Sequence, residues 1–246
     1  MKALVITSAV TFVPDNYDDL ILGLAESPHV QGLVVINNRS VDIFLKAFLL
    51  ILSGAGPVMG WHLLKNSLDD SVSRKKKYYE SLGKKFYLVK DINSEESLKL
   101  LSSFEPDIIL NARTRSFFKK QLLSLPKIGC LNIHHGLLPN QRGLMCDFWA
   151  HLLNTPFGFS IHEMTSKLDD GPLLKVVEVT SDKKDYLESL KIGARLEATA
   201  ASEVLEEIAQ RQKIFGSENL KTEHTFYRRN PGLLDFYKLR LKGIKI

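Results

Sequence analysis

The sequence predicts an α/β fold, namely a doubly wound, mostly parallel sheet with a C-terminal helix and tail. Two observations predict it. Short apolar runs alternate with helix-like segments through the first half of the chain, as in successive strand–helix–strand units. A single long helical pattern begins near residue 185. Because ligands in such sheets bind beyond the carboxyl ends of the strands, chemistry is expected at those ends.

Four apolar runs in the first half are expected to be buried strands, and four helix-like segments lie between them. The strands are Leu4–Ile6, Leu33–Ile36, Phe86–Val89 and Ile108–Leu110. The helices are Asp18–Glu26, Val41–Leu52, Asp70–Leu82 and Ser94–Ser103. The last of these begins with two glutamates near Ser94, which is the favourable charge for a helix start.

The pattern in the second half of the sequence predicts three more strands, one long helix and a C-terminal tail. The strands are Leu131–His134, Phe157–Met164 and Leu173–Val179, and the helix is Asp185–Gln212. The tail Thr225–Ile246 is basic and aromatic, and it either packs on the body or closes over a substrate. We therefore expect a catalytic domain over residues 1–184, with the helix and tail of residues 185–246 packed on it.

Composition gives an ordinary soluble globular protein. The 246 residues carry a net charge of +5, are 44% hydrophobic and have a mean hydropathy of −0.06. These values exclude collagen, disordered and disulfide-rich proteins. Cys130 and Cys146 are too few for a disulfide framework, and the first residues read as a strand rather than a signal peptide, so a cytoplasmic location is expected.

The most apolar segment, Ile43–Leu64, is interrupted by Lys46 and by the sequence SGAGP at residues 53–57. A membrane span needs about 20 uninterrupted apolar residues. A pair of buried helices is the favoured interpretation, and an exposed apolar surface for membrane contact or dimerisation is the alternative. The basic run Arg74–Lys77 is expected to be a solvated helix face, so no nucleic-acid partner is expected.

Potential catalytic residues concentrate between Gly129 and Leu174. Asn132 and His134 are two residues apart on a predicted strand, so their side chains project to the same side. Asp169 lies in a tight polar loop further on. An Asn amide can donate to a developing oxyanion, a His can move a proton near neutral pH, and an Asp can orient and charge that His. With an attacking amine, no Ser or Cys nucleophile is needed.

The order of these residues resembles the signature of the formyltetrahydrofolate-dependent formyltransferases. This chain carries Asn-Ile-His at 132–134, Leu-Pro at 138–139, Gly143 and Leu-Asp-x-Gly at 168–171. The resemblance implies a Rossmann-like sheet and one-carbon group transfer from N10-formyltetrahydrofolate to an amine. It also implies that Asn132 binds the formyl oxygen, that His134 stabilises the tetrahedral intermediate, and that Asp169 sets the charge of His134 and assists proton removal.

The resemblance also indicates where the folate would bind. The stretch Pro106–Phe118 resembles the family's folate-lining segment, and it is more polar here. The residues expected to contact the cofactor are Asn111, Arg113, Thr114, Leu138, Asp170 and Gly171. Asp170 stands where the family often has Thr. It either shares charge with Asp169, which would raise one pKa, or simply caps the turn.

The acceptor is expected to contact His135, Gly136 and Arg142, and a diphosphate could also lie near Arg113 or Arg115. Elimination favours a small amine, such as an amino sugar nucleotide. Residues 7–11 lack the glycines of the glycinamide ribonucleotide enzymes. The 77 residues after Asp169 leave little room for the β-rich domain of the tRNA enzymes, and the first strand leaves none for the regulatory domain of the hydrolases.

Other possibilities stay open at this stage. The chain could be a formyltetrahydrofolate hydrolase, a homologue of the tRNA enzymes or a non-catalytic protein with this fold. His162 could lie near the site or be an ordinary strand histidine. No metal is expected, since no group of His, Cys, Asp and Glu has ligand spacing. A homo-oligomer is possible.

Overall fold

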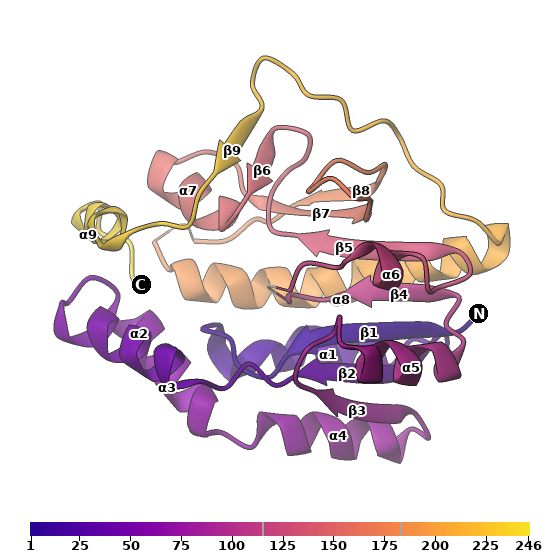
Figure 1. Cartoon of the computed structure of the whole chain (residues 1–246). Coiled ribbons are helices and arrows are strands. Elements are labelled where there is room, and N and C mark those ends of the chain that lie inside the picture. The colour runs from indigo at the N-terminus through magenta and orange to yellow at the C-terminus, as the bar shows by residue number, and fades with distance from the viewer. Residues whose placement is uncertain (115, 183) are drawn as a thin grey trace.

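The computed structural model describes residues 1–114, 116–182 and 184–246. Its centre is a seven-stranded sheet of order β3-β2-β1-β4-β5-β7-β8 (Figure 1). The strands are β1 Ala3–Ser8, β2 Val30–Ile36, β3 Lys85–Val89, β4 Ile108–Asn111, β5 Gly129–His134, β7 Gly158–Glu163 and β8 Leu173–Glu178. Pairing is parallel from β3 to β5 and antiparallel for β7 and β8. The predicted doubly wound, mostly parallel sheet is confirmed.

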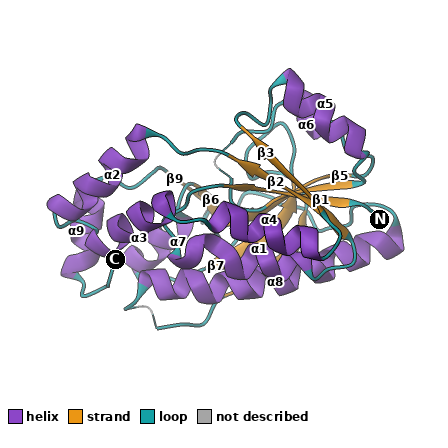
Figure 2. Cartoon of the chain, turned by 90° about the horizontal axis from the view of Figure 1, so that it is seen from below, coloured by secondary structure: helices purple, strands orange, loops and turns teal. Residues whose placement is uncertain are grey.

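Helices cover both faces of the sheet, with α5 and α6 on one side and α1, α4 and α8 on the other (Figure 2). Alternate residues of β1 therefore enter two separate apolar clusters, Ala3 and Val5 in one and Leu4 and Ile6 in the other. The helices are α1 Asp18–Ala25, α2 Val41–Leu52, α3 Pro57–Leu68, α4 Ser71–Ser81, α5 Glu95–Phe104, α6 Lys120–Leu123, α7 Cys146–Leu153, α8 Tyr186–Arg211 and α9 Leu233–Leu241. A short 3-10 helix, η1 Pro14–Tyr17, precedes α1.

The long helix α8 matches its prediction within a residue at each end. Asp185 caps it by accepting the backbone N–H of Glu188 at 3.0 Å. The helix packs closely on α1, because a Cβ at Gly23 would lie only 2.8 Å from that of Ala198. Beyond α8 the chain passes the edge strand β8, where Leu173 and Ser217 form an isolated bridge, and strand β9 (Phe226–Arg228) pairs with β6 (Gln141–Gly143).

The prediction of two buried helices in the apolar segment is wrong for α2, whereas α3 buries Met59 and packs Val58 and Leu63 against the core. The helices form where expected, with α2 ending before the Gly-rich break and α3 beginning at Pro57. However, Ala47 is the sole buried side chain of α2. Its exposed apolar residues are Val41, Leu45, Phe48, Leu49 and Leu52. Among the described residues, no helix has the length and apolar character that crossing a bilayer requires.

The basic run on α4 is also only partly the solvated face that was expected. Lys75 is buried, and its ammonium lies 3.1 Å from the carboxylate of Asp18 and donates to the backbone oxygen of Asn16 at 2.7 Å. Burial lowers the pKa of Lys75, and the charge of Asp18 opposes that shift. This lysine therefore ties α4 to the start of α1, while Lys76 and Lys77 remain exposed.

Candidate active site

Three neighbouring strands bring amide and imidazole groups together at the carboxyl ends of β4 and β5. Asn111 and Asn132 are register partners, and Asn111 Nδ2 donates to Asn132 Oδ1 at 2.9 Å. Asn132 Nδ2 lies 3.1 Å from His162 Nε2. His162 Nδ1 lies 2.8 Å from the backbone oxygen of Glu163, which can only accept, so Nδ1 carries the hydrogen and Nε2 accepts. The Asn132 amide is thus held at both ends, with one N–H left to donate.

His162 is neutral in this arrangement. Burial, with the nearby His134 as the second cause, lowers its pKa from 6.5 to about 4. Sequence reasoning left the place of this histidine open. The signal that could have placed it was its position on the predicted strand Phe157–Met164. In the structure that strand pairs with β5, and His162 lies directly opposite Asn132.

This lowered pKa predicts a pH-dependent difference in stability. As pH falls from 6.5 towards 4, the unfolded chain binds a proton that the native His162 refuses, so the free energy of unfolding falls by up to about 1.4 kcal/mol per pH unit. Relative to the variant His162→Gln, the wild type should lose stability in that window and not outside it. Urea unfolding at a series of pH values measures the difference, with the exposed His224→Gln as control. A difference that stays constant with pH would show that His162 is not buried as a neutral imidazole.

His134 faces the same side of β5 as Asn132. Its Nε2 lies 2.7 Å from the backbone oxygen of Gln141, so Nε2 carries a hydrogen, and Nδ1 lies 3.4 Å from Asp169 Oδ1. The side chain is only 7% exposed. Nδ1 is therefore the nitrogen that faces the Asp169 carboxylate. A Cβ at Gly136 would lie 2.7 Å from His134 Nε2, so glycine is needed there.

Asp169 is placed by a strained turn. Its backbone is left-handed (φ 51°), a conformation that Asp tolerates better than most residues. Its Oδ2 accepts the backbone N–H of Gly143 at 2.9 Å, which leaves Oδ1 facing His134 Nδ1 and, at 3.9 Å, His162 Nε2. A Cβ at Gly171 would lie 2.0 Å from the backbone oxygen of Glu163, so the turn requires glycine there too.

Arg142 supports this turn from beneath. It is fully buried and donates to the backbone oxygens of Asp169, Pro139 and Asn219, and to the carboxylate of Asp170 at 3.0 Å. The side-chain amide of Asn219 in turn donates to the backbone oxygens of Asp169 and Gly171. The guanidinium is thus engaged with the protein, so the phosphate contact predicted for it would require these bonds to break. Sequence reasoning missed Asn219, since nothing in the sequence links it to a loop 50 residues away.

A second buried cluster lies on the opposite side of β5. Arg113 forms an ion pair with Glu197 of α8. His135 bridges two carboxylates, with Nδ1 3.0 Å from Asp147 Oδ2 and Nε2 3.3 Å from Glu197 Oε1. Burial raises the pKa of both carboxyls, although the charge of Arg113 opposes the shift. The hydroxyl of Tyr186 also donates to Asp147 at 3.2 Å.

The structure thus divides the predicted site residues into three groups. Those brought together at the strand ends are Asn111, Asn132, His134 and Asp169. Those in the second cluster are Arg113 and His135. Those that shape the supporting loops are Thr114, Gly136, Leu138, Arg142, Asp170 and Gly171. Arg115 lies outside the described residues. The roles assigned to all of these residues remain predictions.

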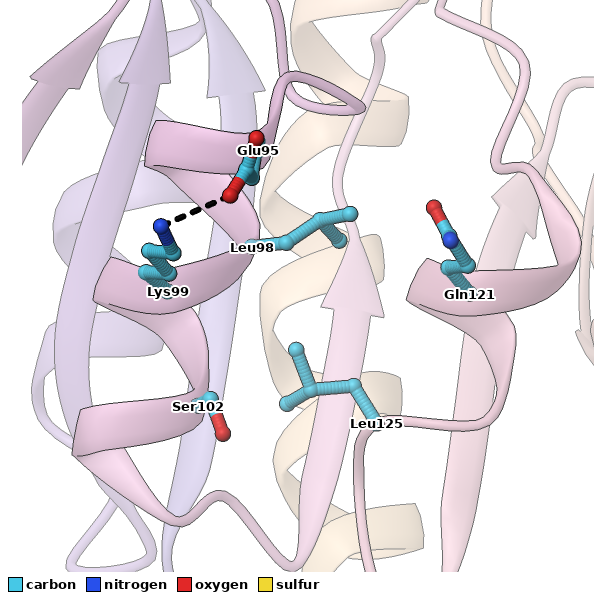
Figure 3. A pocket seen from close by; sticks show the side chains of 6 residues that line it. All are labelled: Glu95, Leu98, Lys99, Ser102, Gln121 and Leu125. Atoms are coloured by element: carbon cyan, nitrogen blue, oxygen red, sulfur yellow. Dashed lines mark ion pairs between the residues drawn. The ribbon is translucent and has the colours of Figure 1, made fainter.

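Two hollows in the described residues lie away from the Asn132–His134–Asp169 group. One is an open groove between α5 and α6, where Glu95 and Lys99 form an ion pair of 2.7 Å on one helix (Figure 3). The other is a small internal cavity beside His135 and Glu197. Within the described part of the chain no cluster of His, Cys, Asp and Glu could hold a metal ion. Burial raises the pKa of the Cys130 and Cys146 thiols. Both therefore stay protonated, and a protonated thiol is a poor nucleophile.

Comparison with known proteins assigns the chain to a family. The model of the formyl transferase family matches residues 69–206, which is more than half of the chain and contains all three of Asn132, His134 and Asp169. The chain belongs to the formyl transferase family. The seven-stranded sheet and its flanking helices agree with that assignment.

Two curated proteins match parts of the chain. A bifunctional polymyxin resistance protein ArnA of Wigglesworthia glossinidia brevipalpis is 33% identical over 132 residues, or 50% of this chain. A methionyl-tRNA formyltransferase of Thermotoga maritima is 34% identical over 108 residues, or 43% of this chain. The matches span only 20% and 34% of the lengths of these two relatives.

Solved structures of the formyl transferase family share the fold. A phosphoribosylglycinamide formyltransferase from Anaplasma phagocytophilum superposes with a TM-score of 0.61 at 18% identity, covering 93% of this chain and 99% of that one. A 4-N formyltransferase from Francisella tularensis gives 0.57 at 17% identity, covering 92% of this chain and 75% of the other. At these identities the likeness concerns the fold and does not identify an acceptor.

Proposed function

We propose that this chain transfers a formyl group from N10-formyltetrahydrofolate to the primary amine of a small acceptor, with an amino sugar nucleotide as the favoured class. The observation that carries the proposal is the convergence of Asn132, His134 and Asp169 in a fixed geometry. Asn132 contributes an oriented amide donor. His134 contributes an imidazole whose Nδ1 faces the carboxylate of Asp169. This is the donor set that formyl transfer to an amine requires.

N10-formyltetrahydrofolate supplies an activated formyl group when it is bound. Asn132 would hold the formyl oxygen with its remaining N–H, because Asn111 and His162 already engage the rest of its amide. His134, when protonated at Nδ1, would donate a hydrogen bond to that oxygen, on which negative charge develops as the amine attacks. Asp169 would stabilise the protonated imidazole and accept the proton that the attacking amine loses. The bond from the formyl carbon to N10 would then break, and that proton would pass to N10, leaving tetrahydrofolate and the formamide.

The carboxyl end of β1 supports an acceptor other than glycinamide ribonucleotide. A phosphate nest there would need free backbone N–H groups. In this chain the N–H of Val10 donates to Asn38 Oδ1 at 2.9 Å, and that of Thr11 donates to Asn16 Oδ1 at 2.7 Å. These donors are already used within the protein, so an acceptor phosphate would have to bind elsewhere.

The proposal predicts that tetrahydrofolate release depends on an amine. The protein is incubated with N10-formyltetrahydrofolate alone, and then with a panel of nucleotide-linked amino sugars, glycinamide ribonucleotide and methionyl-tRNA. We expect release with at least one amino sugar, together with a formamide product seen by mass spectrometry. Release of formate without any amine would instead identify a hydrolase. No turnover and no folate binding would indicate a non-catalytic protein of this fold.

A further inference from the structure

Helices α2 and α9 expose apolar stripes at one end of the molecule, where both views place them (Figures 1 and 2). The exposed residues of α2 recur at helical spacing, and they include Leu45 and Leu52, which are 62% and 82% exposed. On α9, Leu234, Tyr237 and Leu241 recur three and four residues apart, and Leu241 is 87% exposed. Ordinary exposed apolar residues are scattered singly, so two such stripes indicate a contact surface.

Helix α9 meets the chain at the turn that follows α2. The hydroxyl of Tyr237 donates to the backbone oxygen of Ser53, the residue after Leu52, and Arg240 donates to the oxygen of Gly54. Phe236 packs beneath them, so close to Gly56 that a Cβ there would lie 3.2 Å from its ring. We call this the α2–α9 face, and it consists of Val41, Leu45, Phe48, Leu49, Leu52, Leu234, Tyr237 and Leu241.

Basic residues outnumber acidic ones in the two segments that carry this face. Segment 39–65 holds three Arg or Lys residues and one Asp, and segment 226–246 holds six and one. Their excess is seven positive charges, of which Lys65 and Lys245 pair with Asp15 and Asp185 outside the two segments. Lys46 lies beside Leu45 on α2, and Lys238 lies between Leu234 and Leu241 on the same side of α9. Both lysines are exposed.

We propose that the α2–α9 face docks on the surface of a membrane that contains anionic lipids. Apolar helix faces flanked by lysine and arginine lie at the boundary of headgroups and acyl chains, and an exposed Tyr suits that interface. Each basic residue near an anionic bilayer adds electrostatic attraction. A second copy of this chain is a poorer occupant, because it would bring the exposed lysines of the two faces, Lys46 and Lys238, close to their own copies.

Vesicle sedimentation tests this docking without folate or an acceptor, so its outcome is independent of the proposed catalysis. The whole chain is mixed with vesicles of phosphatidylcholine alone or of phosphatidylcholine with phosphatidylglycerol. We expect binding to the anionic vesicles only, weakened by added salt. The variant L45E/L52E should bind at least about tenfold more weakly, since it places carboxylates where the leucines would enter the bilayer.

Matched variants separate the apolar contribution from the charge. L82E/L88E alters two exposed leucines near β3, and it should bind like the wild type. K46E/K238E keeps the apolar stripes and reverses two charges, and it should also bind at least about tenfold more weakly. Circular dichroism of each variant checks that it is folded.

Several results would overturn the proposal. The first is that the wild type binds neither kind of vesicle. The second is that L45E/L52E binds anionic vesicles as tightly as the wild type does. A third is a wild-type dimer, seen by analytical ultracentrifugation, that L45E/L52E converts to a monomer while neither protein binds vesicles. That last result would assign the α2–α9 face to self-association instead.

Discussion

Replacing His134 by Ala is expected to lower the rate of formyl transfer by about a thousandfold or more, because one group supplies both the donor to the formyl oxygen and the proton site beside Asp169. Folate affinity should stay close to that of the wild type, since the imidazole contributes mainly as charge develops in the transition state. Tetrahydrofolate release measures the rate, and binding of a non-reactive folate analogue measures the affinity.

The exposed His224→Ala variant is the control, and it should keep wild-type activity. A His134→Ala enzyme with wild-type turnover would remove His134 from the reaction. A variant that loses folate binding along with turnover would instead indicate that the imidazole holds the pocket in shape. The two parameters measured together therefore separate a catalytic from a structural histidine.

Replacing Arg142 by Met is expected to lower the free energy of unfolding by about 3 to 5 kcal/mol. The loss arises because Met removes the guanidinium that donates to the backbone oxygens of Asp169 and Asn219 and to the carboxylate of Asp170. Urea unfolding measures it. The same variant should reduce turnover, since Arg142 holds the backbone of Asp169.

Arg142→Lys should recover little of this stability, because one ammonium cannot reach the several acceptors that the planar guanidinium joins. Arg211→Met is the matched control. That arginine is half-exposed, pairs with Glu207 on its own helix, and should change stability by only about 0.5 kcal/mol. If Arg142→Met is as stable as this control, the guanidinium does not support the turn as described.

Sequence periodicity predicted most of the fold, because buried strands and capped helices carry strong local patterns. It failed for α2, where apolar content was interpreted as burial although this helix turns one apolar side to solvent. Composition measures how apolar a helix is and does not report which neighbour covers it. The direction of each helix face depends on tertiary packing, which no local pattern encodes.

The candidate site was predicted unevenly for a related reason. Asn132, His134 and Asp169 could be found because their spacing resembles a family signature. The contact between His162 and Asn132 depends on strand register, and the one between Asn219 and Arg142 on the path of the chain past β8. Arg113 was assigned to the cofactor, whereas its side chain forms an ion pair with Glu197 from a helix far along the sequence. Such long-range contacts leave no local trace.

The long span of the Arg142 contacts also bears on the order in which the molecule assembles. Arg142 bonds to groups 27 and 77 residues further along the chain, and loop closure over such separations is slow compared with local pairing. The sheet can form before Asn219 arrives, but the Asp169 turn cannot take its final shape until then. In a refolding experiment, folate-binding competence should therefore appear after the helical signal has recovered.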